Sequence, residues 1–221
     1  MYAATLARRL LKTALHRAVP VRAAHSPTFS IATQWDGTPL PAKDHVKLSV
    51  CSQSAAPHSI VLKVEAPFYD DPAPPAPSGS ACDQLWDYEV VEAFFLGPEE
   101  KYLEVELCPL GQHLILTLEG VRCIKKHMLP LEFTANVDKS GGRWTGEALI
   151  PLEYFPPSVT HFNAYAIHGT GDDRVYSSLY PAAAGQFEQP DFHRLQFFKE
   201  VDFSAVCNRP LPAASGSSKF W

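Results

Sequence analysis

The sequence lacks any uninterrupted apolar stretch that approaches the roughly 20 residues needed to cross a bilayer. It therefore predicts a soluble body without a membrane span. It also lacks a Gly-Lys-Ser phosphate loop, a dinucleotide-binding glycine motif and a nucleophile elbow. These absences remove the enzyme classes with the clearest local motifs, and they favour a non-catalytic role.

Cysteine is scarce, and its spacing shows no functional pattern. The five cysteines are odd in number, far apart and never arranged as Cys-x-x-Cys: Cys51, Cys82, Cys108, Cys123 and Cys207. This pattern predicts buried or incidental thiols in a reducing compartment. His113, His168 and His193 are also too far apart for a local metal motif. The sequence assigns no cofactor and no metal site.

Acidic residues are absent before Asp36, whereas five basic residues precede it: Arg8, Arg9, Lys12, Arg17 and Arg22. On a helix, the apolar residues of this segment form one arc, and most of the basic residues lie opposite. A basic, acid-free and amphipathic N-terminus is typical of a mitochondrial presequence. Residues 1–26 are therefore predicted to be a mitochondrial-type targeting segment. The alternative is a frayed or membrane-touching helix on a cytoplasmic protein.

Without that segment, the body carries 14 Lys plus Arg against 24 Asp plus Glu, a net charge of −10. Neutralising nucleic-acid phosphates requires clustered basic residues, and no basic stripe is present. Nucleic acid is therefore excluded as the main partner. The pattern specifies no oligomeric state.

The body reads as short strand-like runs divided by Pro, Gly, Asn and Asp, which is the all-β pattern. The clearest predicted strands are residues 46–50, 59–66, 89–96, 102–108, 113–118, 131–137, 144–151, 163–169 and 195–201. A single sandwich or barrel over residues 27–207 is expected, followed by a disordered tail over 208–221. The Pro-rich residues 70–80 are predicted to be a long loop, either part of a site or a passive connector.

Two kinds of strand are distinguished by alternation. In residues 102–108, Leu103, Val105 and Leu107 share one face, and the glutamates Glu104 and Glu106 lie on the other, which fits a core face and a solvated face. Residues 89–96 instead carry apolar residues on both faces, as expected for a central strand covered on both sides.

Several motifs carry a resemblance to known proteins. Residues 85–95 (LWDYEVVEAFF), 102–106, 109–111, 144–152 and 190–195 resemble, in this order, family 9 carbohydrate-binding modules and their DOMON-like relatives. The resemblance implies an antiparallel β-sandwich. Within this group, the chain looks closest to a small set of animal proteins of unassigned function, which share residues 35–37, 86–95, 155–157 and 166–169. Fold alone does not carry function.

A sugar site needs an aromatic face and carboxylate or amide groups, and the resemblance places these roles on Trp86 and Glu92. In family 9 modules, a Trp before this strand stacks on the sugar and an acidic residue in the strand accepts hydrogen bonds from it. We expect Trp86, Glu92, Glu104 and His113 to be ligand-binding residues, the last two at the edge. Alternatively, Trp86 closes the sandwich, Glu92 accepts from loop amides, and Glu104 lies on a solvated face.

Three functions remain open from the sequence. The leading hypothesis is a non-catalytic binding module for a carbohydrate or another small molecule. The second is a glycan-acting hydrolase in which Glu92 and Glu104 serve as acid and base. The third is a protein-interaction domain, which would have a shallow cleft and a buried Trp86.

Overall fold

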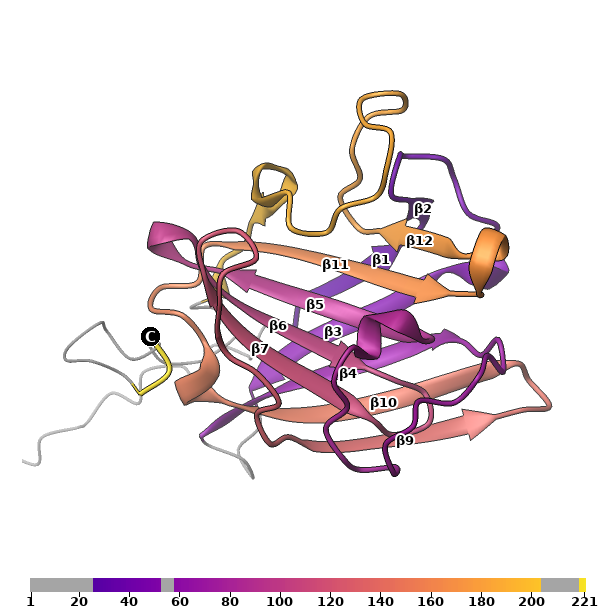
Figure 1. Cartoon of the computed structure of the whole chain (residues 1–221), viewed down its shortest axis with the longest axis horizontal. Coiled ribbons are helices and arrows are strands. Elements are labelled where there is room, and N and C mark those ends of the chain that lie inside the picture. Colours follow the sequence, from indigo (N-terminus) through magenta and orange to yellow (C-terminus); the bar gives the residue numbers. More distant parts are fainter. Residues whose placement is uncertain (1–25, 53–57, 204–218) are drawn as a thin grey trace, which may run out of the picture.

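The computed structural model of the chain describes residues 26–52, 58–203 and 219–221. All strands pair antiparallel, and they form two sheets packed as a sandwich (Figure 1). The predicted antiparallel β-sandwich is confirmed. No helix in these ranges is long and apolar enough to cross a membrane.

One sheet has five strands. Its order is β1 (Thr28–Ile31), β3 (Val46–Ser52), β4 (Ser59–Pro67), β10 (Arg143–Pro151) and β9 (Glu132–Asp138). Strands β3 and β10 alternate in burial, with one face toward the core and the other face more exposed.

The other sheet has eight strands. Its order is β2 (Thr33–Gln34), β12 (Val175–Ser178), β11 (His161–His168), β5 (Val90–Leu96), β6 (Lys101–Leu107), β7 (His113–Glu119) and β8 (Ile124–Lys126), and β13 (Lys199–Glu200) also pairs with β11. Short 3-10 helices interrupt the connections: η1 (Ala42–Asp44), η2 (Leu85–Asp87), η3 (Pro98–Glu100), η4 (Leu152–Tyr154), η5 (Gly171–Asp173) and η6 (Leu195–Phe197).

The main core lies between the two sheets. Leu103, Val105 and Leu107 of β6 meet residues of the five-stranded sheet such as Leu62 and Trp144. The expected core face of β6 is therefore confirmed.

A second apolar cluster lies on the outer face of the eight-stranded sheet. It joins Phe94, Leu114, Leu116 and Tyr165 to residues of the loops that cover them, among them Leu85. Strand β5 is buried on both faces, as its sequence predicts. The outer face of the sheet is therefore a covered surface with its own side-chain packing.

The second cluster corrects one expectation. Glu104 and Glu106 were expected on a solvated face, yet only 4% and 0% of their surfaces are exposed. They lie on the same outer face as Tyr102 and Phe94, under the covering loops. A β-strand pattern shows which residues share a face, but it does not show what covers that face.

Several boundaries differ from the prediction. Glu89 precedes β5, and residues 195–201 form η6 and the two-residue β13. The short strands β1, β2, β8 and β12 were not predicted, because two to four residues carry little periodicity. Residues 70–80 form no strand, as expected, and Ala76 from this loop packs on the second cluster.

The predicted ends of the chain lie mostly outside the described residues. Residues 1–25 of the targeting segment and 204–218 are not described. The last three residues were expected in a disordered tail, but Phe220 is buried with its ring 4.9 Å from Tyr154. Its carbonyl accepts a 3.3 Å hydrogen bond from the Thr117 hydroxyl.

The aromatic centre of the main core yields a stability prediction. The Phe95 ring is fully buried, and its centroid lies 5.0, 5.1 and 5.5 Å from Phe155, Phe162 and Phe203. We expect Phe95→Ala to lower the free energy of unfolding by about 3 to 5 kcal/mol, because the cavity cannot collapse fully. Urea unfolding measures this, with Thr134→Ala on the exposed face of β9 as the control. A loss below about 1 kcal/mol for Phe95→Ala would contradict this packing.

Candidate functional site

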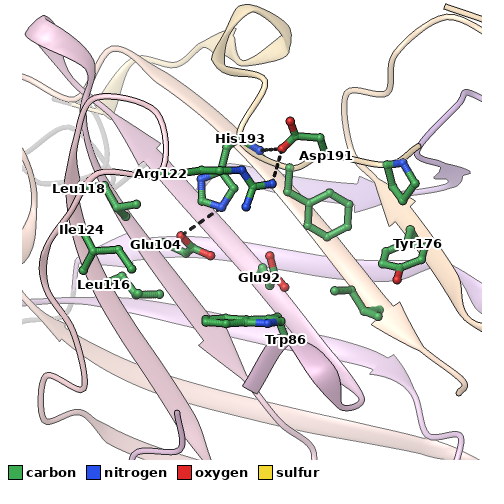
Figure 2. Close-up of a pocket in the computed structure, with 13 residues that line it drawn as sticks. Trp86, Glu92, Glu104, Leu116, Leu118, Arg122, Ile124, Tyr176, Asp191 and His193 are labelled. Carbon is green, nitrogen blue, oxygen red and sulfur yellow. Dashed lines mark hydrogen bonds and ion pairs between the residues drawn. The ribbon is translucent and has the colours of Figure 1, made fainter. Parts of the chain in front are cut away.

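A cavity of about 380 Å³ opens on the outer face of the eight-stranded sheet. Strands β5, β6, β7 and β11 contribute its floor, and the η2 loop, the β7–β8 turn and residues 190–193 form its walls (Figure 2). The lining residues are Trp86, Glu92, Glu104, Leu116, Leu118, Arg122, Ile124, Ile167, Tyr176, Pro190, Asp191, Phe192 and His193. The cavity therefore combines apolar walls with a few convergent polar groups, as ligand pockets do.

Trp86 lies in η2 at the edge of this cavity with 37% of its surface exposed. Its backbone is held firmly, because the Arg174 guanidinium donates to the carbonyl of Trp86 and, at 2.8 Å, to that of Asp87. Leu85 anchors the same short helix in the second cluster. The chain is thus fixed on both sides of an indole ring that remains accessible.

Three carboxyl groups lie together on the outer face of strands β5 and β6, and we call Glu92, Glu104 and Glu106 the carboxyl row. Glu92 is directly opposite Glu106 in the β5–β6 register, and Glu104 is two residues further along β6. Directly opposed residues of an antiparallel pair have Cβ atoms about 5 Å apart, and diagonal ones about 7 to 8 Å. Glu92 is 2% exposed, and its Oε1 has no hydrogen-bond partner among the described residues.

Burial favours the protonated form of each carboxyl group in the row. It raises the pKa of Glu104 to about 8. The pKa of Glu92 is also raised, first by burial and then by the charge of Glu104. Burial, followed by the charges of Glu92 and Glu104, raises the pKa of Glu106 in the same way. The empty cavity therefore presents neutral carboxylic acids, which both donate and accept hydrogen bonds.

A hydrogen-bonded network lies beside the carboxyl row. The Arg122 guanidinium is 2.7 Å from Asp191 Oδ1, which also accepts from the His193 backbone N–H at 2.9 Å. The Tyr102 hydroxyl accepts a 3.0 Å hydrogen bond from the backbone N–H of Arg122, and it lies 2.7 Å from His193 Nδ1. Because the Tyr102 hydroxyl already accepts one hydrogen bond, it donates its own proton to His193 Nδ1. A neutral imidazole then carries its proton on Nε2, which lies 4.0 Å from Glu104 Oε2.

This histidine is uncharged at neutral pH. Burial, followed by the charge of Arg122, lowers the pKa of His193 to about 4. The contact between His193 and Glu104 is therefore a contact between two neutral groups. Figure 2 shows Trp86 on one side of Glu92 and Glu104, and the Arg122–Asp191 pair on the other.

The structure brings three of the four expected ligand-binding residues together. Trp86, Glu92 and Glu104 line the same cavity, and their role in binding stays a prediction. His113 does not line this cavity. It lies on the opposite face of β7 from Leu114 and Leu116, and its buried ring has a lowered pKa.

Other lining residues were not expected from the sequence: Arg122, Asp191, Tyr176, Leu116 and Leu118. Asp191 and His193 lie in the 190–195 motif, which was interpreted as a fold signature. Arg122 and Asp191 are 69 residues apart in sequence, so no local spacing connects them. Within the described residues, no group of three His, Cys, Asp or Glu side chains is placed to hold a metal ion.

Sequence comparison shows close similarity to a set of animal proteins. The chain is 48% identical to the mouse UPF0462 protein C4orf33 homolog over 184 residues, which cover 80% of this chain and 92% of that protein. It is 45% identical to the zebrafish homolog (80% and 90% covered) and 44% identical to the human UPF0462 protein C4orf33 (80% and 89% covered). No protein-family model matches the chain.

Structural comparison finds the same fold in a bacterial protein. The "putative carbohydrate-binding protein" of Bacteroides uniformis superposes with a TM-score of 0.60 over 79% of this chain and 85% of its own. The two sequences are 15% identical, so this likeness concerns the fold alone.

The raised pKa values of the carboxyl row predict how stability depends on pH. A carboxyl with a raised pKa binds its proton more tightly in the folded chain than in the unfolded chain. The free energy of unfolding should therefore fall as pH rises from about 6.5 to 8, and Glu104, with its pKa of about 8, contributes about 1.4 kcal/mol per pH unit over most of this range. Below about pH 6.5, the buried histidines act in the opposite sense, because their pKa values are lowered.

Denaturant unfolding at pH 6.5, 7.2 and 8 tests this expectation. Glu104→Gln keeps the shape of the side chain but cannot ionise, so it should make the decline with pH shallower by the share that Glu104 contributes. Glu132→Gln, exposed on β9, should retain the decline. A profile of the unmodified chain that does not fall over this range would contradict the raised pKa values.

Proposed function

The chain belongs to the UPF0462 family, and we propose that it is a non-catalytic binding module whose cavity takes a carbohydrate. The observation that carries this proposal is the exposed Trp86 ring beside the buried carboxyl groups of Glu92 and Glu104. An indole face packs on the apolar face of a sugar ring, and the carboxyl groups exchange hydrogen bonds with hydroxyls. Trp86 and Glu92 are the two residues to which the family 9 resemblance assigns these roles.

The size of the cavity fits a small ligand. Its volume of about 380 Å³ lies near the lower end of the roughly 300 to 1,000 Å³ range of ligand pockets. A ligand of one or two sugar units suits this volume better than a long chain. The fold shared with the Bacteroides uniformis protein, whose name includes carbohydrate binding, adds support at the level of architecture.

A glycan-acting hydrolase is less well supported. An acid–base pair works when its environment moves the two pKa values apart, so that one group is protonated and the other ionised. Here burial is the first cause of a raised pKa for both Glu92 and Glu104. Burial acts to raise the pKa of Asp191, but hydrogen bonds from the His193 backbone N–H and from Arg122 outweigh burial and lower this pKa, so the lining does hold an ionised carboxylate. That carboxylate is already paired with the Arg122 guanidinium at 2.7 Å and is not free to act as the base.

A protein-interaction domain is also less well supported. That function would fit a shallow cleft with Trp86 inside the fold. Trp86 is instead one of the few large exposed apolar residues, and it borders a defined cavity.

The binding proposal predicts a graded effect of changes at Trp86. We expect isothermal titration calorimetry with glucose, cellobiose and maltose to detect binding by at least one sugar. Trp86→Ala should weaken that binding about tenfold to a hundredfold, since stacking contributes about 1 to 3 kcal/mol, whereas Trp86→Phe should retain part of it. Met128→Ala, at another exposed apolar residue, is the control. Equal affinities of Trp86→Ala and the unmodified chain would contradict the proposed platform.

We also propose that residues 1–26 direct the chain to mitochondria, from their basic, acid-free and amphipathic pattern. The full chain with a C-terminal fluorescent tag should co-localise with a mitochondrial marker in animal cells. A triple variant in which Arg8, Arg9 and Lys12 are each replaced by Glu should lose this co-localisation, because it removes the positive charge on which the pattern depends. A diffuse signal from the unmodified chain would contradict the proposal.

A further inference from the structure

Among the described residues, the carboxyl row has no cationic ion-pair partner. In the described ranges, no Lys or Arg side chain forms an ion pair with Glu92, Glu104 or Glu106. The two arginines nearest the cavity are engaged elsewhere: Arg122 pairs with Asp191, and Arg174 binds backbone carbonyls. Buried acidic groups are normally paired, so this arrangement leaves a position for a positive charge.

The geometry of the row indicates where that charge fits. Glu92 Oε1 is buried without a partner, and Glu92 and Glu104 both face the cavity. An ammonium group carries three N–H donors, enough to reach two carboxylates and a third acceptor. A sugar hydroxyl carries one donor, so it can donate to only one of the two carboxyl groups, and it brings no positive charge to either.

We propose that the carbohydrate is an amino sugar whose primary ammonium group lies between Glu92 and Glu104, on the side of the carboxyl row that faces Trp86. This inference rests on the proposed function and narrows its ligand class. The Trp86 side of the row is favoured because Arg122 occupies the other side (Figure 2). A cation beside an indole face is attracted by the ring as well.

Binding of the cation should be coupled to loss of a proton. Burial favours the protonated form of Glu92 and Glu104 when the cavity is empty, and a carboxylate pairs with ammonium far better than a carboxylic acid does. One carboxyl O–H bond therefore breaks on binding, its electron pair stays on the oxygen, and the proton passes to the buffer.

Several groups face the carboxyl row and influence this step. Around Glu92, the neighbouring carboxyl groups are those of Glu104 and Glu106 on β6, and the Tyr165 hydroxyl lies on β11. The Arg122 guanidinium of the β7–β8 turn is there with its partner Asp191 and with neutral His193. The Arg174 guanidinium lies before β12. The two arginines favour an ionised Glu92, and the neighbouring carboxyl groups oppose it. One ionised carboxylate per bound cation is therefore the expected stoichiometry.

Calorimetry of the full chain at pH 6 tests the inference with three probes: glucosamine, glucose and N-acetylglucosamine. Titrations in two buffers of different ionisation enthalpy count the protons released. We expect glucosamine to bind about tenfold or more tightly than glucose and to release about one proton, because a charge-assisted bond replaces a neutral one. Glucose and N-acetylglucosamine should release none. Glucosamine affinity should also rise about tenfold from pH 6 to pH 7, as release of one proton requires.

Two isosteric variants separate charge from shape. Glu92→Gln and Glu104→Gln should each bring glucosamine affinity down to that of glucose, with circular dichroism confirming that the variants fold. Glu132→Gln on the distant β9 should leave glucosamine binding unchanged.

The outcomes distinguish this inference from the proposed function. If glucose binds as tightly as glucosamine and no proton is released, the amino-sugar inference is overturned while carbohydrate binding stands. Equal binding of N-acetylglucosamine and glucosamine also overturns the inference, because the acetyl group removes the charge. If none of the three probes binds, the amino-sugar inference fails, and titration with cellobiose and maltose decides whether carbohydrate binding stands.

Discussion

The structure depends on an eight-stranded sheet whose central strands are covered on both faces. The five-stranded sheet covers one face and builds the main core. Loops and short 3-10 helices cover the other face and leave a cavity over β5, β6 and β7. Since these strands are fixed from both sides, the side chains that reach the cavity floor are held by the same packing that holds the fold.

That double coverage also determines the chemistry of the cavity. On a solvated sheet face, Glu104 and Glu106 would be ordinary carboxylates; under the covering loops, they join Glu92 as protonated acids. Burying three such groups costs stability, and folding has to offset that cost elsewhere, chiefly through the apolar surface of the two clusters. An arrangement that weakens the empty protein is expected where binding, not stability alone, has shaped the residues.

The features that follow from local alternation of apolar and polar residues could be predicted from the sequence. Alternation in β6 and the two apolar faces of β5 indicated the sandwich and the central position of Glu92, and the family 9 resemblance directed attention to Trp86. The burial of Glu104 could not be predicted in this way, because the loops that cover it have no periodicity and are distant in sequence. His113 was expected at the edge of the site, but it lies on the face of β7 opposite Leu116 and Leu118, which border the cavity. Alternation alone shows which residues share a face, and not which face borders a cavity. The pairing of Arg122 with Asp191 depends on tertiary structure alone.

The way in which Trp86 is held has a consequence for how the family can diversify. Arg174 donates hydrogen bonds to the backbone carbonyls of Trp86 and Asp87, and Leu85 packs in the second apolar cluster. Neither contact involves the indole ring itself. The side chain at this position can therefore change without remodelling the loop that presents it. A related protein with the same scaffold can therefore present a smaller or more polar side chain at the edge of the cavity through a change of a single codon.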